Sequence, residues 1–279
     1  MLVSINGNTN PINNAVFTPV FLLEAISLNL LDKRSIRMVT QSAAKIFLAE
    51  ERGRNEQEWF RSMNTFNFGN FYNENKFPFE SLYVLNEDTL AGNHKISVLV
   101  ENDSCLVLVP IVGAIAFKDS AGNSGLLEAG QAQVLNVYED TSLEISNPYK
   151  EDLVNFLQIW IKMPNLQTTV PQLFSFDLDQ NLDQLLELFS PQKKSMLKTV
   201  SAPRGMIGKF SGRSEAVYKT VQPGNALFAY VIEGNVEVQY RLMNPRDGLG
   251  LWDLKEIELE ALSDNAIIII LEIPVLKTV

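Results

Sequence analysis

The feature that most constrains this chain is a series of short apolar segments between Ser81 and Ile161, each about as long as a β-strand. Gly, Asn, Asp and Pro separate the segments, and these residues favour the tight turns that join neighbouring strands. The pattern predicts a compact all-β unit closed by tight turns. The apolar segments are Val98–Val100, Cys105–Ala116, Ala132–Val137, Leu143–Ile145 and Phe156–Ile161.

The segment Cys105–Ile115 is rich in β-branched residues and has almost no polar interruption. A strand with one wet face alternates apolar and polar residues, whereas a strand covered on both faces is apolar throughout. We therefore expect Cys105–Ile115 to be a strand buried on both faces, as in a small barrel.

A second series of strand-length segments begins at Met206, with turn residues such as Pro223-Gly224 and Asp247-Gly248 between them. The run Ala266–Leu271 (AIIIIL) is predicted to be a central strand, because an exposed segment of this kind would aggregate. The expected strands are Met206–Phe210, Ala216–Val221, Leu227–Ile232, Val236–Tyr240, Ile257–Leu262 and Ala266–Ile273.

The segment Met163–Pro203 links the two series and contains Pro164 and Pro171, which favour irregular backbone. Within it, Asp179–Phe189 (DQNLDQLLELF) has leucines at helical spacing after an acidic start. Acidic residues stabilise a helix N-terminus, so this segment is predicted to be a short helix packed across the barrels.

The N-terminal Val16–Leu31 is apolar but lacks the basic start and cleavage site of a secretion signal, and it is too short for a membrane span. Its apolar residues roughly follow helical spacing, which favours a short amphipathic helix packed on the barrel. The alternative is that translation starts at Met38 and the upstream residues are not native.

Composition restricts the class of partner. The 279 residues carry a formal net charge of −10, which disfavours nucleic acid and anionic membranes because both are negative. The single cysteine, Cys105, allows no disulfide within the chain, so nothing points to an oxidising compartment and we expect a cytoplasmic protein.

Several short motifs occur in one order along the N-terminal half. They are Ala49-Glu50-Glu51-Arg52-Gly53, Trp59-Phe60, Thr65-Phe66-Asn67-Phe68, Leu85-Asn86-Glu87-Asp88, Gly113-Ala114, Lys118-Asp119-Ser120-Ala121-Gly122-Asn123, Ala129-Gly130-Gln131-Ala132-Gln133, Ser146-Asn147-Pro148 and Phe156-Leu157-Gln158-Ile159-Trp160-Ile161. In order and spacing they resemble the N-terminal barrel of the pirin-like proteins, whose chains hold two cupin barrels. Val231-Ile232-Glu233-Gly234, after Pro223-Gly224, resembles the first cupin motif of a second barrel.

The resemblance implies an all-β bicupin, with two jelly-roll-type cupin barrels in one chain and a few short helices. The expected parts are an N-terminal extension (1–43), an N-terminal barrel (44–163), a linker with a short helix (164–203) and a C-terminal barrel (204–279).

The resemblance also implies a divalent metal in the N-terminal barrel, held by a His-x-His pair, a later His and often a Glu. Gapless counting from the matching motifs places Leu99, Glu101, Leu143 and Ile145 at those positions. Leu and Ile offer no lone pair to a metal, and imidazole is the usual ligand for such sites. Strand alternation directs all four side chains into the barrel, with Leu99 near Leu143. We therefore predict that the site has lost its metal and that the protein has no cofactor.

The single histidine, the single cysteine and two acidic residues are further candidates for a functional site. His94, the single histidine, is expected in a surface loop without a special role, and Cys105 is expected to be an inward-facing, inert thiol. Glu101 and Asp103 could bind a cation weakly, although Asn102-Asp103 is also typical of a turn.

The aromatic segment Asn64–Tyr72 (NTFNFGNFY) is typical of a buried core, although it could instead line the mouth of a pocket. The candidate pocket-lining residues are Phe66, Phe68 and Cys105.

Three functions remain open at this stage. The favoured one is a metal-free, non-catalytic bicupin that binds a small apolar ligand or a protein partner, but not nucleic acid or membrane. The alternative is a metal-dependent oxygenase of the quercetin 2,3-dioxygenase type, an activity found among pirin-like proteins. A third is hydrolysis or isomerisation with Glu101 as a general base in a dry pocket.

Overall fold

The computed structural model describes residues 42–164, 166, 170–191 and 202–275. Within these ranges the regular structure is β-strand except for one short 3-10 helix, η1 (Ala49–Glu51). The all-β prediction is confirmed. The expected helix at Val16–Leu31 and the alternative start at Met38 lie outside the described residues.

The N-terminal barrel is built from two antiparallel sheets. The larger has seven strands in the order β12 (Gln172–Ser175), β9 (Gln131–Val137), β6 (Ser104–Val112), β11 (Val154–Lys162), β4 (Leu82–Leu90), β3 (Phe60–Asn64) and β2 (Gly53–Gln57). The smaller has four strands in the order β5 (Lys95–Leu99), β10 (Ser142–Ser146), β7 (Ala114–Asp119) and β8 (Ser124–Glu128).

The C-terminal barrel repeats this plan. Its larger sheet has six strands in the order β1 (Ala44–Phe47), β19 (Gly248–Leu251), β16 (Ala226–Glu233), β21 (Ala266–Ile273), β14 (Arg204–Phe210) and β13 (Gln184–Phe189). Its smaller sheet has four strands in the order β15 (Glu215–Lys219), β20 (Glu256–Ala261), β17 (Val236–Val238) and β18 (Arg241–Met243).

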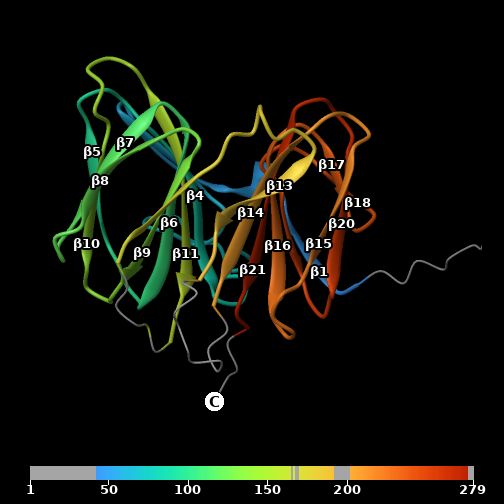
Figure 1. The fold of residues 1–279 in the computed structure, drawn as a ribbon. Helices are drawn as coiled ribbons and strands as arrows, with labels where there is room; N and C mark the ends of the chain where they lie inside the picture. Colours follow the sequence, from blue (N-terminus) through green and yellow to red (C-terminus); the bar gives the residue numbers. More distant parts are fainter. Residues whose placement is uncertain (1–41, 165, 167–169, 192–201, 276–279) are drawn as a thin grey trace, which may run out of the picture. The chain divides into compact units, whose positions relative to one another are not determined.

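Alternation along the strands divides the buried side chains among three cores. In β6, Leu106 and Leu108 pack inside the N-terminal barrel, whereas Val107 and Val109 pack against residues of β14, β16 and β21. Figure 1 accordingly shows β6 and β11 beside β14 and β21. The third core fills the C-terminal barrel. A strand between two cores is buried on both faces, which is why β6 is apolar almost throughout.

The central position predicted for Ala266–Leu271 is confirmed, because β21 lies between β16 and β14. The predicted segment Cys105–Ala116 is divided into β6 and β7 at Gly113, whose φ of 78° lies in the left-handed region that glycine tolerates.

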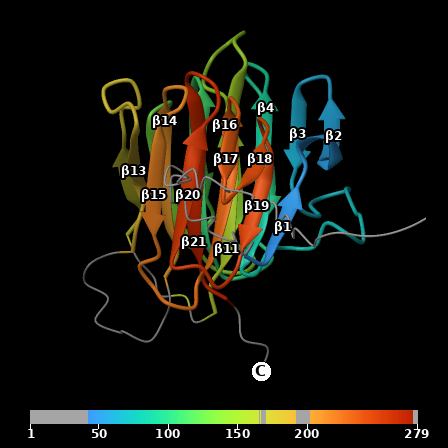
Figure 2. The ribbon, with the colours of Figure 1, turned by 90° about the vertical axis from the view of Figure 1, so that its right-hand side faces the viewer.

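The first strand departs from the predicted division. Ala44 was expected to open the N-terminal barrel, but β1 pairs with β19, with Ala44 opposite Leu251 and Phe47 opposite Gly248. Figure 2 shows β1 next to β19 among the strands of the C-terminal half. A strand pattern carries no information about its pairing partner, so the sequence did not reveal this exchange.

The expected linker 164–203 also contains strands of both barrels. β12 joins the N-terminal sheet, and β13 pairs with β14 in the C-terminal sheet. The helix predicted at Asp179–Phe189 is therefore wrong. Its leucines follow helical spacing, but pairing with β14 and packing against the neighbouring cores override that local pattern.

Candidate functional site

One wall of the N-terminal barrel consists of the paired strands β5 and β10. Val98 lies opposite Leu143 and Ile96 lies opposite Ile145, and all four side chains belong to the core of this barrel. This wall therefore presents only hydrocarbon to the interior.

The predicted inward positions on β5 are wrong by one residue. Leu99 is 58% exposed and lies opposite Ser142, so it does not meet Leu143, and Glu101 is also exposed. The inward residues are Ile96, Val98 and Val100. Because residues 98–100 are all apolar, the alternation of apolar and polar residues could not show which of them face inward. The exposure of Glu101 also removes the basis for a general base in a dry pocket.

The opposite wall, on the larger sheet, carries a group of buried polar side chains. Asn64 of β3 and Gln158 of β11 lie on either side of Asn86 of β4, and Ser62 lies opposite Asp88 in the next row. All five side chains are buried. They occupy the same face of the sheet as core residues such as Val84 and Trp160, so they point into the barrel.

The hydrogen bonds of this polar wall are incomplete. Gln158 Nε2 donates to Asp88 Oδ2 at 2.5 Å, and Asn64 Nδ2 donates to Ser62 Oγ at 2.8 Å. Among the described residues, however, Asp88 Oδ1, Gln158 Oε1, both amide atoms of Asn86 and Trp160 Nε1 have no partner. An unpaired buried polar atom costs about 1–3 kcal/mol, so a cluster of them calls for a functional explanation.

Asp88 is the ionisable group of this wall. Burial raises its pKa from 3.8 to about 6, against the hydrogen bonds from Ser62 and Gln158, which act to lower it. The carboxyl group therefore changes charge close to neutral pH, unlike a solvated aspartate.

A hollow of about 390 Å³ opens onto the polar wall, and Ser62, Asp88 and Gln158 form its floor. Aromatic and aliphatic side chains line its sides, namely Trp59, Phe60, Phe68, Ile96 and Val98. Asn55, Glu56, Gln57, Asn70, Lys95 and Ser97 also line it, so the surface of the hollow is mixed rather than purely apolar. A combination of aromatic surface and convergent polar groups is typical of small-molecule sites, and the volume suits a small organic ligand.

Two charged residues stand at the rim of the hollow, and both are paired with neighbours. Glu56 forms an ion pair with Arg54, and Lys95 donates to Glu144 at 2.8 Å. Both are exposed, so neither compensates the buried charge of Asp88 by direct contact.

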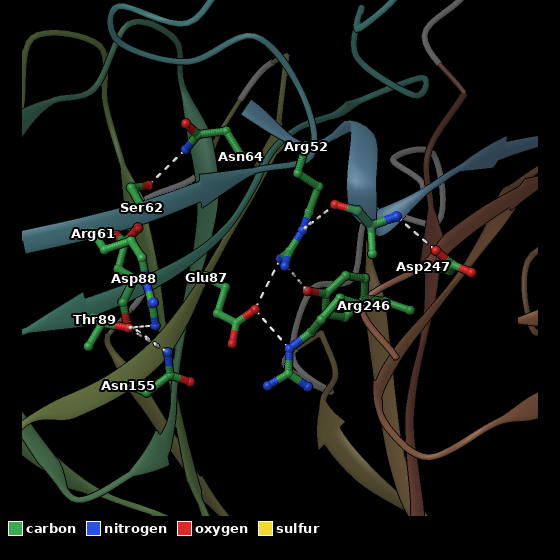
Figure 3. A network of polar contacts seen from close by, with 12 residues as sticks. Arg52, Arg61, Ser62, Asn64, Glu87, Asp88, Thr89, Asn155, Arg246 and Asp247 are labelled. Atoms are coloured by element: carbon green, nitrogen blue, oxygen red, sulfur yellow. Dashed lines mark hydrogen bonds and ion pairs between the residues drawn. The ribbon is translucent and has the colours of Figure 1, made fainter. Parts of the chain in front are cut away.

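The neighbouring Glu87 points to the other face of β4, where it joins the two barrels (Figure 3). Its Oε2 accepts hydrogen bonds from Arg52 Nη1 at 3.0 Å and Arg246 Nε at 2.8 Å. Burial acts to raise the pKa of Glu87, but the hydrogen bonds and charges of Arg246 and Arg52 outweigh it and lower the pKa. This network is a structural contact between the barrels.

The candidate pocket residues occupy different places. Phe68 lines the hollow, with its ring edge-on to Trp160 at 6.0 Å between centroids. Phe66 and Cys105 instead lie in the core between the two barrels. Cys105 therefore faces away from the interior of its own barrel, contrary to prediction, and burial raises the pKa of its thiol to about 12.

His94 is exposed in the turn before β5. Its ring stacks on Trp59 at 5.1 Å between centroids, and Nδ1 lies 2.7 Å from the carbonyl oxygen of Gly92. Within the described ranges, no three His, Cys, Asp or Glu side chains gather as metal ligands. The same ranges hold no helix with the length and hydrophobicity needed to cross a membrane.

The polar wall was missed by sequence reasoning, although a signal was present. On the inward face of β4, the polar residues Asn86 and Asp88 lie between the apolar residues Val84 and Leu90. In β11, Gln158 lies between Phe156 and Trp160 on the same face. Polar residues at the inward-facing positions of a buried strand indicate an internal polar site.

Comparison with protein families gives two matches. The family described as Pirin matches residues 47–161, and the quercetinase C-terminal cupin domain matches residues 188–273. Together they span most of the chain, one over each barrel.

Individual proteins agree with these families. The quercetin 2,3-dioxygenase of Escherichia coli K12 is 25% identical over 221 residues, covering 79% of this chain and 95% of that protein. A pirin-like protein of Caulobacter vibrioides is 24% identical over 217 residues, covering 76% and 92% respectively.

Solved structures share the fold. The crystal structure of YhhW from Escherichia coli has a TM-score of 0.71 at 23% identity and covers 85% of this chain and all of that one. A structure of bacterial pirin YhhW in complex with nickel(II) has a TM-score of 0.69 at 22% identity, with 84% of this chain and all of that chain covered.

Proposed function

The chain belongs to the pirin family of two-cupin proteins, and from that premise we propose that its N-terminal barrel is a metal-free, non-catalytic receptor for a small ligand. The observation that carries the proposal is the contrast between the two walls of this barrel. One wall is hydrocarbon, and the other holds buried polar atoms that have no partner among the described residues and lie beside an open hollow.

A transition metal does not fit the side chains of this interior. The inward positions of β5 and β10 are Ile96, Val98, Leu143 and Ile145, which have no donor atoms. The polar wall offers one carboxylate with amide and hydroxyl groups, a set without imidazole or thiolate. Iron, nickel, copper and zinc sites in proteins are usually built on nitrogen or sulfur ligands, so the donor set supports a metal-free barrel.

A ligand, by contrast, fits both the shape and the chemistry of the hollow. Its apolar sides would cover a hydrocarbon or aromatic body, and its floor would hydrogen-bond a polar end. Binding would supply partners to Asp88 Oδ1 and Gln158 Oε1, which removes the free-energy cost of leaving them unpaired.

The first test is the metal content of the full-length protein, purified from medium supplemented with iron, nickel, zinc and copper. We expect far less than one metal ion per chain by elemental analysis. One equivalent of any of these metals that survives dialysis against a chelator would overturn the proposal.

Histidine substitution tests the assignment of the inward face. The triple variant Ile96→His, Val98→His and Leu143→His places three imidazoles on the inner face and is expected to gain chelator-resistant nickel binding. The matched control changes Leu99→His, Glu101→His and Leu143→His. Its first two positions are exposed, so only loose binding is expected, and tight nickel binding by the control alone would contradict the register of β5.

A metal-dependent oxygenase is the second candidate, and the names of relatives such as the Escherichia coli quercetin 2,3-dioxygenase favour it. The test is oxygen uptake with quercetin after incubation with nickel or iron. Chelator-sensitive turnover would establish this candidate in place of the receptor, whereas uptake no greater than with metal alone would eliminate it.

A further inference from the structure

We propose that the hollow of the N-terminal barrel takes a small organic cation, a primary amine or amidinium group on an apolar body. This inference rests on the receptor function proposed above and names the chemical class of its ligand. It follows from the hydrogen-bonding character of the floor, the lining of the sides and the charges around Asp88.

The floor of the hollow needs hydrogen-bond donors. Asp88 Oδ1 and Gln158 Oε1 have no partner within the described structure, and both residues line the hollow. Gln158 Nε2 could otherwise donate to an acceptor on a ligand, but it already donates to Asp88 Oδ2. A ligand group that meets these two oxygens must therefore donate, and an ammonium or amidinium group supplies several N–H donors at once.

The charge of Asp88 favours a cationic donor over a neutral one. The side chain is 1% exposed, and an ionised carboxylate at such depth is unfavourable unless an opposite charge meets it. Trp59, Phe60 and Phe68 add aromatic surface at the sides, and ring faces attract cations by roughly 0.5–2 kcal/mol.

The groups that surround Asp88 leave its charge uncompensated. Ser62 of β3 and Gln158 of β11 are neutral. On its own strand, Glu87 adds negative charge but is held by Arg52 and Arg246 on the opposite face of the sheet. At the rim, Lys95 of β5 and Glu56 of β2 are each ion-paired in solvent. Among the described residues that line the hollow, the cation is Lys95 at the exposed rim, so an anionic ligand would meet Asp88 without a buried cation to receive it.

The test compares three ligands of one shape, 2-phenylethylamine, 2-phenylethanol and phenylacetate, with the purified full-length protein at pH 8. Binding is measured by calorimetry and by tryptophan fluorescence, since Trp59 lines the hollow. We expect the amine to bind at least about tenfold more tightly than either analogue.

Two variants and a control locate the effect. Asp88→Asn removes the charge while keeping the shape and should weaken amine binding by about tenfold or more, with little change for the alcohol. Phe68→Leu, at a half-buried position, should weaken amine binding by a smaller factor. Glu58→Gln neutralises an exposed carboxylate that does not line the hollow and should leave binding unchanged.

The pH dependence gives an independent readout. The amine stays protonated between pH 8 and pH 5, whereas Asp88 takes up a proton as the pH falls through about 6. Affinity for the amine should therefore fall by up to about tenfold per pH unit below 6, while affinity for the alcohol should not.

The outcomes separate this inference from the receptor function. If the alcohol or the carboxylate binds more tightly than the amine and Phe68→Leu weakens that binding, the cation is excluded and the receptor function survives. If none of the three ligands binds, both proposals are overturned. Amine binding that is unchanged in Asp88→Asn overturns the assignment of the cation to this hollow.

Discussion

The two barrels each bury a carboxylate on the larger sheet, and the surroundings of the two groups are opposite. In the C-terminal barrel, Glu272 is fully buried and accepts hydrogen bonds from Tyr218 Oη, Asn225 Nδ2 and the backbone N–H groups of Val221 and Gln222, at 2.6–2.9 Å. In the N-terminal barrel, Asp88 Oδ2 accepts from Gln158, and Oδ1 has no partner among the described residues.

Buried polarity alone therefore does not mark a binding site in such a fold. Glu272 connects the loop after β15 to β21, because both of its carboxylate oxygens accept hydrogen bonds from that loop. Within the described ranges, Asp88 Oδ1 has no hydrogen-bond partner, and the residue lines a hollow. Complete pairing indicates a structural role, and incomplete pairing beside a cavity indicates a binding role.

The largest effect on stability is expected from neutralising Glu272. Glu272→Gln leaves four donors with a weaker acceptor and sets an amide NH₂ against one of them. We expect the free energy of unfolding to fall by roughly 3 kcal/mol, measured by urea denaturation at pH 7. A change below about 1 kcal/mol would show that these hydrogen bonds do not stabilise the barrel.

The matched substitution Asp88→Asn should act in the opposite direction. Asp88 has a folded-state pKa of about 6, above its unfolded value, so the cost of ionising it is absent at pH 4, develops between pH 4 and 6 and is complete above 6. The variant should therefore raise the free energy of unfolding by roughly 2 kcal/mol at pH 8 and by almost nothing at pH 4. Destabilisation at pH 8 would show that the carboxylate has the same structural role as Glu272.

Removing the charge at the contact between the barrels should lower the free energy of unfolding by a smaller amount. Glu87→Gln removes the charge shared by Arg52 and Arg246, and we expect a loss of about 1–2 kcal/mol at pH 7. The folded-state pKa of Glu87 is lowered, so its contribution is present above the unfolded value of about 4.3 and is lost as the pH falls through the folded one. The free energies of unfolding of the two proteins, measured by urea denaturation, should therefore converge once the pH is below the lowered folded-state pKa of Glu87. A difference that stays constant with pH would contradict an ionic origin.

The smallest effect is expected on the outer face of the smaller sheet. Glu144 bridges Lys95 and Lys118 in solvent, where ion pairs contribute little. Glu144→Gln should leave the urea midpoint unchanged within error, and a clear shift would show that exposed pairs matter here as much as buried ones.

Much of the fold was accessible from the sequence because strand-length apolar segments and turn residues encode strands locally. The all-β class and strands such as β14 and β21 were predicted within a few residues. Pairing between distant strands is not encoded locally, so the exchange of β1 and the sheet membership of β12 and β13 were not predicted.

The site was harder to predict for two physical reasons. Residues 98–100 are all apolar, so the sequence does not show which of them face the interior. Leu99 was therefore predicted to face inward, whereas its side chain is exposed. The polar wall depends on register across three strands, because Asn64, Asn86 and Gln158 meet only when β3, β4 and β11 pair as they do. The relevant residues were visible as motif matches, but their unpaired atoms appear only once partners can be counted.

The pairing of β1 with β19 sets an order of assembly during translation. Ala44–Phe47 is synthesised before the other strands of both barrels, whereas its hydrogen-bonding partner Gly248–Leu251 is synthesised after the N-terminal barrel. The nascent chain must keep this strand available while the first barrel closes around the residues that follow it. Completion of the second barrel then pairs β1 with β19, so that cutting between the barrels would separate a sheet from its own edge strand.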